Sequence, residues 1–431
     1  MTGFRPERPE TVFTYGAPGL KFGVGARHEL GYDLAQLGAR RVLVVTDPGV
    51  AATGAPAEVA DALRADGIDA LVFDRARVEP TDASLIEAIE FARSEGRFDA
   101  IVAIGGGSSI DTAKAVNLLV TNEGDLMDYV NAPVGRAQAP ANPLLPLVAV
   151  PTTTGTGSES TTICVLDVLA QHVKTGISHP RLRPTLALVD PELTVTQPAG
   201  VTAAAGLDIL CHALESYTAR PYASYEHKNA DERVPYCGSN PIADMWSERA
   251  LTLMAGAFRT AVRDGSDLEA RTQVAMAATF AGLGFGNAGV HIPHANAYPI
   301  AGQVRDFRPK DYDADHAMVP HGMAVALTAP ASFGFTFAAA PERHQRAAEL
   351  LSQGSSAELP DDPAQHLPHV LTGIMREVGI PSGLAEVGYG SSDIDALVEG
   401  TMKQQRLLAT APREVTEEDV AGILDESIEL W

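Results

Sequence analysis

The strongest constraint on the fold is a change of pattern roughly 200 residues into the chain. Before it, short runs of β-branched and apolar residues alternate with segments of helical periodicity. The β-rich runs are 41–46, 70–73, 100–104, 147–150 and 185–190. After it, the pattern is helical, and the longest stretches are 203–218, 241–262, 268–283 and 318–335. Strands that alternate with helices predict a mainly parallel sheet. We therefore expect an α/β domain over residues 1–197 and an all-helical domain over 198–431.

Composition and charge exclude several classes of partner. The 431 residues are 45% hydrophobic and 20% charged, which suits two globular domains. A formal charge of -23, with no block of basic residues, argues against binding to nucleic acid or anionic membranes. The apolar stretch Val274–Val290 is interrupted by Thr279, Asn287 and glycines, so we interpret it as a buried helix pair rather than a membrane span.

The cysteines and the N-terminus predict a cytoplasmic enzyme. Three scattered cysteines lack CxxC spacing, which favours a reducing compartment. The N-terminal residues MTGFRPERPETVF contain no apolar run and carry two glutamates, unlike a secretory signal or a transit peptide. We also expect a hairpin from 162–167 and 172–178, and long loops at 223–240 and 305–320 that bind a ligand or a second copy of the chain. The expected assembly is a homo-oligomer, a dimer or larger.

A glycine-rich turn in the first domain is typical of phosphate binding. Residues 101–114 read IVAIGGGSSIDTAK, an apolar strand that enters a helix through three glycines. Glycines admit a pyrophosphate to the backbone, and a helix N-terminus donates N–H groups to it. We expect Ser108 or Ser109 to cap the helix. The candidate phosphate-binding residues are Gly105, Gly106, Gly107, Ser108, Ser109 and Asp111. The alternative is an ordinary tight turn between strand and helix.

Three further features suggest a dinucleotide at the same sheet edge. Asp47 ends a strand in VVTDP, where a carboxylate can bind ribose hydroxyls and disfavour a 2'-phosphate, so NAD is expected rather than NADP. The alternative is that Asp47 caps a helix before Pro48. A second turn, TTTGTGSE, supplies the candidates Thr152, Thr153, Thr156 and Ser158. Lys174 can contact cofactor or substrate, or it can be a solvated strand lysine.

A carboxylate and histidines in the second domain suggest a metal site. Asp208 and His212 are four residues apart in a helical pattern and so lie one turn apart on one face. The alternative is a local polar pair. His294 and His321 follow or begin proline-marked helices and can reach the same ion. One carboxylate with three imidazoles suits a catalytic Fe(II), with Zn(II) as the other choice.

Two residues near His294 are candidates for proton transfer. His291 lies three residues before it and can orient a ligand or carry a proton. Tyr298 lies four residues after it, on the same helical face, and can support the substrate or a proton path. The alternative for Tyr298 is a core tyrosine.

The motifs as a set resemble the iron-containing, group III, alcohol dehydrogenases. The matching segments, in chain order, are GGGSSIDTAK, PTTTGTGSES, DILCHALESY, HANAYP and VPHG. The resemblance extends over nearly the whole chain. It implies the dehydroquinate synthase-like fold of that family, metal ligation by Asp208, His212, His294 and His321, and bound NAD. Many members carry a histidine where Tyr298 stands and have more closely spaced metal histidines than His294 and His321.

Those departures, with segments such as YCGSNPIADMW and KDYDADHAMVPHG, resemble a branch of the family that transfers hydride between two acids. That branch oxidises a 4-hydroxybutyrate-like hydroxyacid and reduces a 2-oxoglutarate-like oxoacid through bound NAD. An ordinary dehydrogenase or aldehyde reductase that releases NADH is the alternative. A lyase related to dehydroquinate synthase and a non-enzymatic metal-binding protein are further rivals. Substrate carboxylates would need a cation, for which Lys174, Arg220, Lys228, Arg233 and Arg305 are candidates.

Overall fold

Two compact units make up the chain in the computed structural model, which describes residues 4, 6–171, 173–312, 316–353 and 358–431. One unit is Ala17–Gln197, and the other combines Met1–Gly16 with Pro198–Trp431. The expected first domain began at residue 1, whereas the described residues before Ala17 group with the helical unit. The reason is local hydrogen bonding, since Glu10 N donates to Tyr225 O at 2.9 Å and Gly16 N donates to Asn287 Oδ1 at 2.8 Å.

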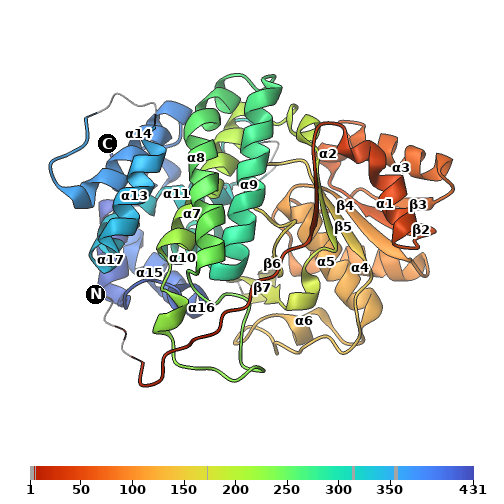
Figure 1. Cartoon of the computed structure of the whole chain (residues 1–431), viewed down its shortest axis with the longest axis horizontal. Helices are drawn as coiled ribbons and strands as arrows, with labels where there is room; N and C mark the ends of the chain where they lie inside the picture. Colours follow the sequence, from red (N-terminus) through yellow and green to blue (C-terminus); the bar gives the residue numbers. More distant parts are fainter. Residues whose placement is uncertain (1–3, 5, 172, 313–315, 354–357) are drawn as a thin grey trace. The chain divides into compact units, whose positions relative to one another are not determined.

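A six-stranded parallel sheet forms the centre of the unit Ala17–Gln197 (Figure 1). The strand order is β1-β8-β5-β4-β2-β3, and neighbouring strands pair in parallel throughout. The strands are β1 (Gly19–Phe22), β2 (Arg41–Val45), β3 (Asp69–Phe73), β4 (Ala100–Gly105), β5 (Leu147–Pro151) and β8 (Leu186–Val189). The predicted α/β class is confirmed. β1 was not expected, because the sequence GLKF is short and its first two residues are exposed.

Helices pack on both faces of this sheet. They are α1 (Leu30–Gln36), α2 (Pro48–Ala51), α3 (Ala55–Ala65), α4 (Asp82–Ser94), α5 (Gly107–Thr121) and α6 (Leu126–Tyr129). Along β2, Val42 and Val44 belong to one hydrophobic cluster, while Leu43 and Val45 belong to another. Alternate side chains point to opposite faces of a strand, so a strand covered on both sides has an uninterrupted apolar sequence.

The carboxyl ends of β4 and β5 place the two glycine- and threonine-rich turns next to each other. Gly105 of β4 pairs with Pro151 of β5, so the chain leaves both strands at the same edge. The expected hairpin is present as β6 (Ile163–Val168) and β7 (Val173–Ser178), which pair antiparallel. His172, part of that expectation, lies outside the described residues. This arrangement makes one edge of the sheet the natural place for a nucleotide.

The other unit is helical among its described residues, and α7 (Ala199–Thr218), α8 (Pro241–Arg263) and α9 (Leu268–Ala288) pack together in it (Figure 1). The later helices are α10 (Ile292–Gly302), α11 (His321–Ala326), α12 (Ala329–Thr336), α13 (Pro341–Leu351), α14 (His366–Val378), α15 (Ile394–Met402), α16 (Gln405–Leu408) and α17 (Glu417–Glu426). The all-helical second domain is confirmed for the part of the chain that the structure describes.

Two predictions about helical stretches in this unit were wrong in detail. Val274–Val290, interpreted as a helix pair, lies almost wholly in the single helix α9. Its Gly284 serves close packing and does not break the helix, since a Cβ there would lie 2.7 Å from Ser247 Oγ. The stretch 318–335 is two helices, since Pro330 marks the first turn of α12. Among the described helices, none combines the length and apolar content needed to cross a membrane.

Candidate metal centre and cofactor turns

Helix α7 carries two of the four predicted metal ligands. Asp208 and His212 are 2% and 4% exposed, and His212 Nε2 lies 3.7 Å from Asp208 Oδ1. The helix is buried on most sides because small residues let its neighbours approach. A Cβ on Gly206 would lie 2.0 Å from Phe258 Cε2 of α8, so only glycine fits there. The close packing fixes the face that carries the carboxylate and the imidazole.

The other two predicted ligands come from α10 and α11. His294 lies in the first turn of α10, and His321 is the first residue of α11. Their Nε2 atoms lie 3.5 Å and 4.0 Å from Asp208 Oδ1. Gly322 allows α11 to approach α7 this closely, since a Cβ there would lie 2.1 Å from Ala204 O. Three imidazoles therefore face one carboxylate oxygen.

The cluster has the geometry of a cation site. Ligand atoms of Asp208, His294 and His321 all lie within 4.8 Å of one another. His212 is not in that group of three, but its ring stacks on His294 with centroids 4.6 Å apart, and it contacts the same Asp208 oxygen. The four residues that the sequence predicted are thus brought together by three helices.

Three atoms of the cluster are buried without a hydrogen-bond partner among the described residues. They are Asp208 Oδ1, His294 Nε2 and His212 Nδ1, and the first two lie 3.5 Å apart. Buried polar atoms in folded proteins are almost always paired, and an uncompensated one costs about 1–3 kcal/mol. A divalent ion bound by the first two atoms would satisfy both. One oxygen and three nitrogens, without thiolate, suit Fe(II) or Zn(II), so the side chains fit the metal that the sequence predicts.

Glu215 is a functional residue that the sequence reasoning missed. Its carboxylate is fully buried and accepts hydrogen bonds from His291 N at 2.7 Å, from His294 N at 3.3 Å and from His294 Nδ1. A proton on Nδ1 leaves Nε2 of His294 unprotonated and directed at the cluster. Spacing could have identified Glu215, because it lies three residues after His212 and therefore on the same face of α7.

Burial and mutual charges set the protonation of the cluster. Burial lowers the pKa of His212 to about 3, which favours the neutral imidazole that a metal needs. Burial also opposes a charge on His294, but Glu215 and Asp208 outweigh it and raise the pKa to about 9. For Asp208, burial opposes ionisation, yet His212 and His321 hold the pKa well below its usual range. A metal at Nε2 of His294 would therefore compete with a proton.

His291 and Tyr298, the predicted proton-transfer residues, flank the cluster. His291 is fully buried, and its Nε2 lies 3.1 Å from Thr218 Oγ1. Because that hydroxyl donates to Leu214 O, His291 Nε2 must be the donor to it, and burial lowers the pKa of His291 to about 4. The Tyr298 ring is buried with its centroid 6.4 Å from that of His321. Their catalytic roles stay predictions.

Helix α5 begins at the glycine turn without a side-chain cap. Its N-cap is Gly106, so neither Ser108 nor Ser109 caps the helix, and that expectation was wrong. Both hydroxyls are used elsewhere, because Ser109 Oγ donates to Asp47 Oδ2 at 2.8 Å and Ser108 Oγ accepts from Glu79 N at 3.1 Å. An uncapped N-terminus of a long helix has N–H donors to offer a phosphate.

Asp47 and Lys174 are both engaged within the protein. Asp47 Oδ1 accepts from Val50 N at 3.0 Å and caps α2, so the hydrogen bond of the alternative interpretation is present. Lys174 is 8% exposed and pairs with Glu79 and, at 3.8 Å, with Asp167. It is therefore not a solvated strand lysine. Contacts of either residue with a cofactor stay predictions.

The threonine turn lies against the glycine turn. A Cβ on Gly106 would lie 2.9 Å from Thr153 Oγ1, and a Cβ on Gly107 would lie 2.7 Å from Thr156 Oγ1. The Thr152 hydroxyl is buried without a hydrogen-bond partner among the described residues. Asp111 and Ser158, predicted to bind the cofactor, bond to each other at 2.6 Å. The glycines are therefore needed for packing between the turns, whether or not a phosphate binds.

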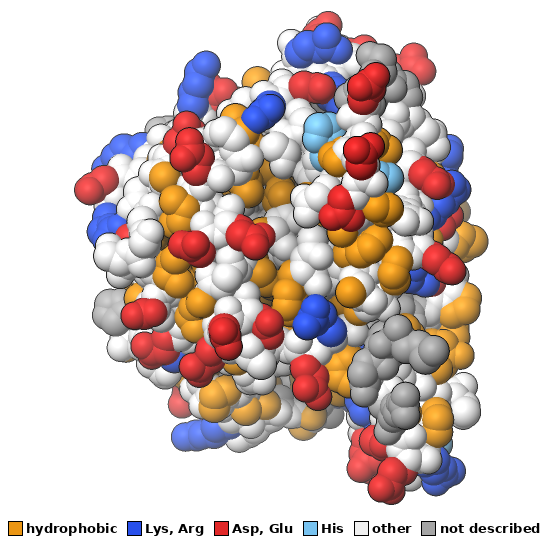
Figure 2. All heavy atoms as spheres, turned by 90° about the vertical axis from the view of Figure 1, so that its left-hand side faces the viewer, with side chains coloured by type: hydrophobic (Ala, Val, Ile, Leu, Met, Phe, Trp, Pro, Cys, Tyr) orange, Lys and Arg blue, Asp and Glu red, His pale blue; other side chains and the backbone are white. Residues whose placement is uncertain are grey.

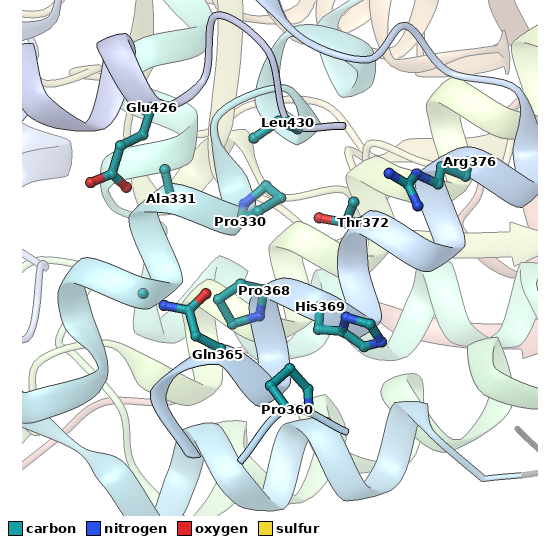
Figure 3. Close-up of a pocket in the computed structure, with 11 residues that line it drawn as sticks. Pro330, Ala331, Pro360, Gln365, Pro368, His369, Thr372, Arg376, Glu426 and Leu430 are labelled. Carbon is teal, nitrogen blue, oxygen red and sulfur yellow. The ribbon is translucent and has the colours of Figure 1, made fainter. Parts of the chain in front are cut away.

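A separate pocket of about 410 Å³ lies in the helical unit (Figure 3). One side is formed by polar residues of α14 and the residue before it, and another by residues of α12. The labelled polar residues are Gln365, His369, Thr372, Arg376 and Glu426. None of the predicted metal ligands lines it. On the face in Figure 2, described Lys and Arg side chains are interspersed with acidic ones.

Comparisons with known proteins identify the family. The model for iron-containing alcohol dehydrogenase matches residues 18–191, and the model for the C-terminal region of the Fe-containing alcohol dehydrogenase family matches 229–428. The mitochondrial hydroxyacid-oxoacid transhydrogenase of Xenopus tropicalis is 45% identical over 98% of this chain and 92% of its own length.

Solved structures share the same fold. A 1,3-propanediol oxidoreductase is 32% identical with a TM-score of 0.83, covering 96% of this chain and 100% of its own. Sulfoacetaldehyde reductase from Bifidobacterium kashiwanohense, solved in complex with NAD+, is 25% identical with a TM-score of 0.79, covering 97% and 99%.

One expectation is overturned by these relatives. The cytoplasmic location that we expected from the N-terminal residues is wrong on this comparison, because relatives 44–45% identical to the chain are named as mitochondrial enzymes. The motif resemblance and the predicted enzyme class are confirmed. With family models matching both units, the chain belongs to the iron-containing alcohol dehydrogenases, and it is an oxidoreductase that uses NAD and a divalent metal.

Proposed function

We propose that the enzyme transfers hydride from a 4-hydroxybutyrate-like hydroxyacid to a 2-oxoglutarate-like oxoacid through NAD that stays bound. The observation that carries the proposal is 45% identity, over 98% of this chain, to a relative named hydroxyacid-oxoacid transhydrogenase. The cluster of Asp208 with three imidazoles supports it, because oxidation of an alcohol benefits from an ion beside the hydroxyl. The expected assembly is a homo-oligomer, which light scattering can measure.

In this proposal, the helical unit would hold the metal ion and the α/β unit would hold the cofactor. Asp208, His212, His294 and His321 would hold the ion, with Fe(II) favoured over Zn(II), while Glu215 would keep His294 in its metal-binding tautomer. The ion would supply Lewis acidity for the substrate hydroxyl, and NAD would accept the hydride and return it. The turns Gly105–Asp111 and Thr152–Ser158 would bind the pyrophosphate, and Asp47 and Lys174 would contact the riboses. His291 and Tyr298 would serve the proton path.

Acid substrates need a cation, and the structure narrows the choice among five. Arg305 pairs with both oxygens of Asp393, Arg233 pairs with Glu10, and Lys174 pairs with Glu79. Lys228 forms no ion pair among the described residues, and its ammonium lies 5.6 Å from the Tyr225 ring centroid. Lys228, with Arg220 stacked on the same ring at 4.1 Å, is therefore our choice for carboxylate recognition.

The test is an assay with 4-hydroxybutyrate and 2-oxoglutarate but no added NAD. Formation of 2-hydroxyglutarate at many turnovers per enzyme, with ping-pong kinetics, is expected. Strict dependence on free NAD would instead support the second candidate, an ordinary dehydrogenase that releases NADH. That candidate is favoured by the 32% identity to 1,3-propanediol oxidoreductase. Lys228→Ala should raise KM for both acids with little change in kcat, and an unchanged KM would exclude its role.

A further inference from the structure

We propose that Lys114 is a positioning residue for NAD: its buried ammonium fixes the glycine turn and the threonine turn relative to each other. Lys114 lies in α5, two turns after the glycines, and its side chain is fully buried. The inference rests on the proposed use of NAD at these turns, and it adds a residue to which no direct contact is assigned.

Four oxygen atoms surround the ammonium. Lys114 Nζ donates to Ser158 Oγ at 2.7 Å, Ile163 O at 2.7 Å and Thr161 Oγ1 at 3.0 Å, and lies 3.3 Å from Asp111 Oδ1. These acceptors belong to α5, to the end of the threonine turn and to the start of β6. An ammonium has three protons, so one side chain can tie three segments of chain together.

Asp111 completes the connection. Its Oδ1 accepts from Ser158 Oγ at 2.6 Å, and its Oδ2 accepts from Val165 N at 2.8 Å. The first turn of α5 is thereby held to the threonine turn on one side and to β6 on the other. Since Asp111 lies only four residues after Gly107, a displacement of this network moves the helix end whose N–H groups would face the phosphate.

The two turns leave little room for such a displacement. Gly106 and Gly107 face Thr153 and Thr156 at distances that a methyl group could not occupy. A ligand held by both turns therefore depends on their relative position, and binding sites lose affinity when supporting residues let that position vary. An apolar side chain could fill the space of Lys114 but could not make directed bonds to three segments. The hydrogen bonds of the ammonium thus fix the orientation of the three segments relative to one another, which packing alone does not.

The experiment measures the dissociation constant of NADH by its fluorescence, on protein stripped of cofactor. Lys114→Met should weaken NADH binding at least tenfold. Because this variant leaves the Asp111 carboxylate buried without its ion-pair partner, the double variant Asp111→Asn with Lys114→Met is measured beside it. The double variant removes both charges, keeps the volumes similar and should still bind NADH at least tenfold more weakly.

A matched control distinguishes positioning from stability. Asn117 lies one turn further along α5, is 2% exposed, and bonds to Leu145 N and O at 2.9 Å and 2.8 Å. Asn117→Ala should lower the unfolding temperature and leave the NADH dissociation constant within twofold. Metal content, measured by elemental analysis, should not change in any of these variants.

The outcomes separate the two proposals. If the Lys114 variants bind NADH as tightly as the wild type while their unfolding temperature falls, Lys114 is a structural residue and the inference is wrong. The inference is also wrong if Asn117→Ala weakens NADH binding as much as Lys114→Met does. If the wild-type protein itself binds no NADH, the proposed function fails, and the inference fails with it.

Discussion

The metal cluster and the cofactor turns differ in how their polar atoms are satisfied. In the turns, the charged and polar side chains of Asp47, Asp111 and Ser158 bond to neighbouring protein groups, and only smaller hydroxyls such as that of Thr152 are buried without a hydrogen-bond partner among the described residues. In the cluster, Asp208 Oδ1 and His294 Nε2 are buried without partners among the described residues. Residues of a shared motif can thus build the architecture of a site without touching the ligand. The unpaired buried atoms of the cluster are charged or ring atoms that face one another, which indicates a ligand more directly than the motif does.

The largest effect is expected at the cluster. His294→Ala should reduce turnover on the order of 10³-fold or more, because it removes a predicted ligand of the ion. That factor corresponds to an increase of roughly 4 kcal/mol in the activation free energy. Elemental analysis should show loss of bound metal. His369→Ala, at an exposed histidine of the same unit, is the control and should change neither quantity. A His294 variant with full metal content would remove the main contrast between the two sites.

The second effect concerns Glu215. Glu215→Gln should lower metal affinity about 10–100-fold, since an amide facing His294 Nδ1 no longer selects the tautomer with a bare Nε2. Metal retained after dialysis against a chelator series gives the affinity directly. Glu215→Asp keeps the carboxylate charge on a side chain that is one methylene group shorter. This variant should retain more metal than the Gln variant. Equal retention by wild type and Glu215→Gln would show that the buried carboxylate does not act through the ligand.

The cofactor side is tested through stability. A Cβ on Gly105 would lie 2.4 Å from Ser109 Oγ and 2.5 Å from Ser109 Cβ. Gly105→Ala should therefore cost about 1–3 kcal/mol of unfolding free energy, which denaturant titration can measure. Gly302→Ala is the control, because its added Cβ would meet no atom within 4 Å. If Gly105→Ala kept full stability but lost NADH binding, the glycine would serve the ligand and not the packing.

The smallest effect is a pH dependence at Glu10, a fully paired carboxylate in the unit that holds the cluster. A hydrogen bond from Lys228 N, opposed by burial and helped by Arg233, lowers its pKa from 4.5 to about 2. A depressed carboxylate pKa stabilises the fold above pH 4.5, and this contribution is lost as the pH falls toward 2. Hydrogen exchange in residues 222–240, divided by the intrinsic exchange rate at each pH, should rise in the wild type as the pH falls from about 4.5 toward 2. Glu10→Gln should show much less change, and equal changes in both would contradict the assignment.

The sequence was sufficient for the fold class, which depends on periodicity, and for the family, which depends on motifs; the choice of His294 and His321 as ligands also came from the motif resemblance. Helix α7 shows why: a strong apolar period is enough to place Asp208 and His212 on one face of a helix. Runs of Val, Leu and Ile that alternate along the chain with helical segments likewise predicted the parallel sheet. The assignment of individual site residues to cofactor, metal or proton transfer remains a prediction, although His294 and His321 do lie beside Asp208.

What could not be predicted depends on tertiary contacts. Nothing local to Ser108 and Ser109 shows that Glu79 and Asp47 would engage their hydroxyls, so a cap was expected where glycine stands. Glu215 and Lys114 lie in helical stretches where polar residues are often solvent-exposed, and only packing buries them. The grouping of the N-terminal residues with the helical unit likewise follows from tertiary hydrogen bonds, whereas Pro330 could have indicated the break between α11 and α12. A location in the cell is not a physical property of the fold and needed the relatives.

The four side chains of the metal cluster differ in how much of their surface is exposed to solvent. The side chains of Asp208, His212 and His294 are at most 5% exposed, whereas that of His321 is 26% exposed. His321 begins a short helix, and its neighbour Gly322 presses against α7. Of these four side chains, that of His321 is therefore the one most in contact with solvent. An ion bound here would therefore have its most exposed predicted ligand in His321.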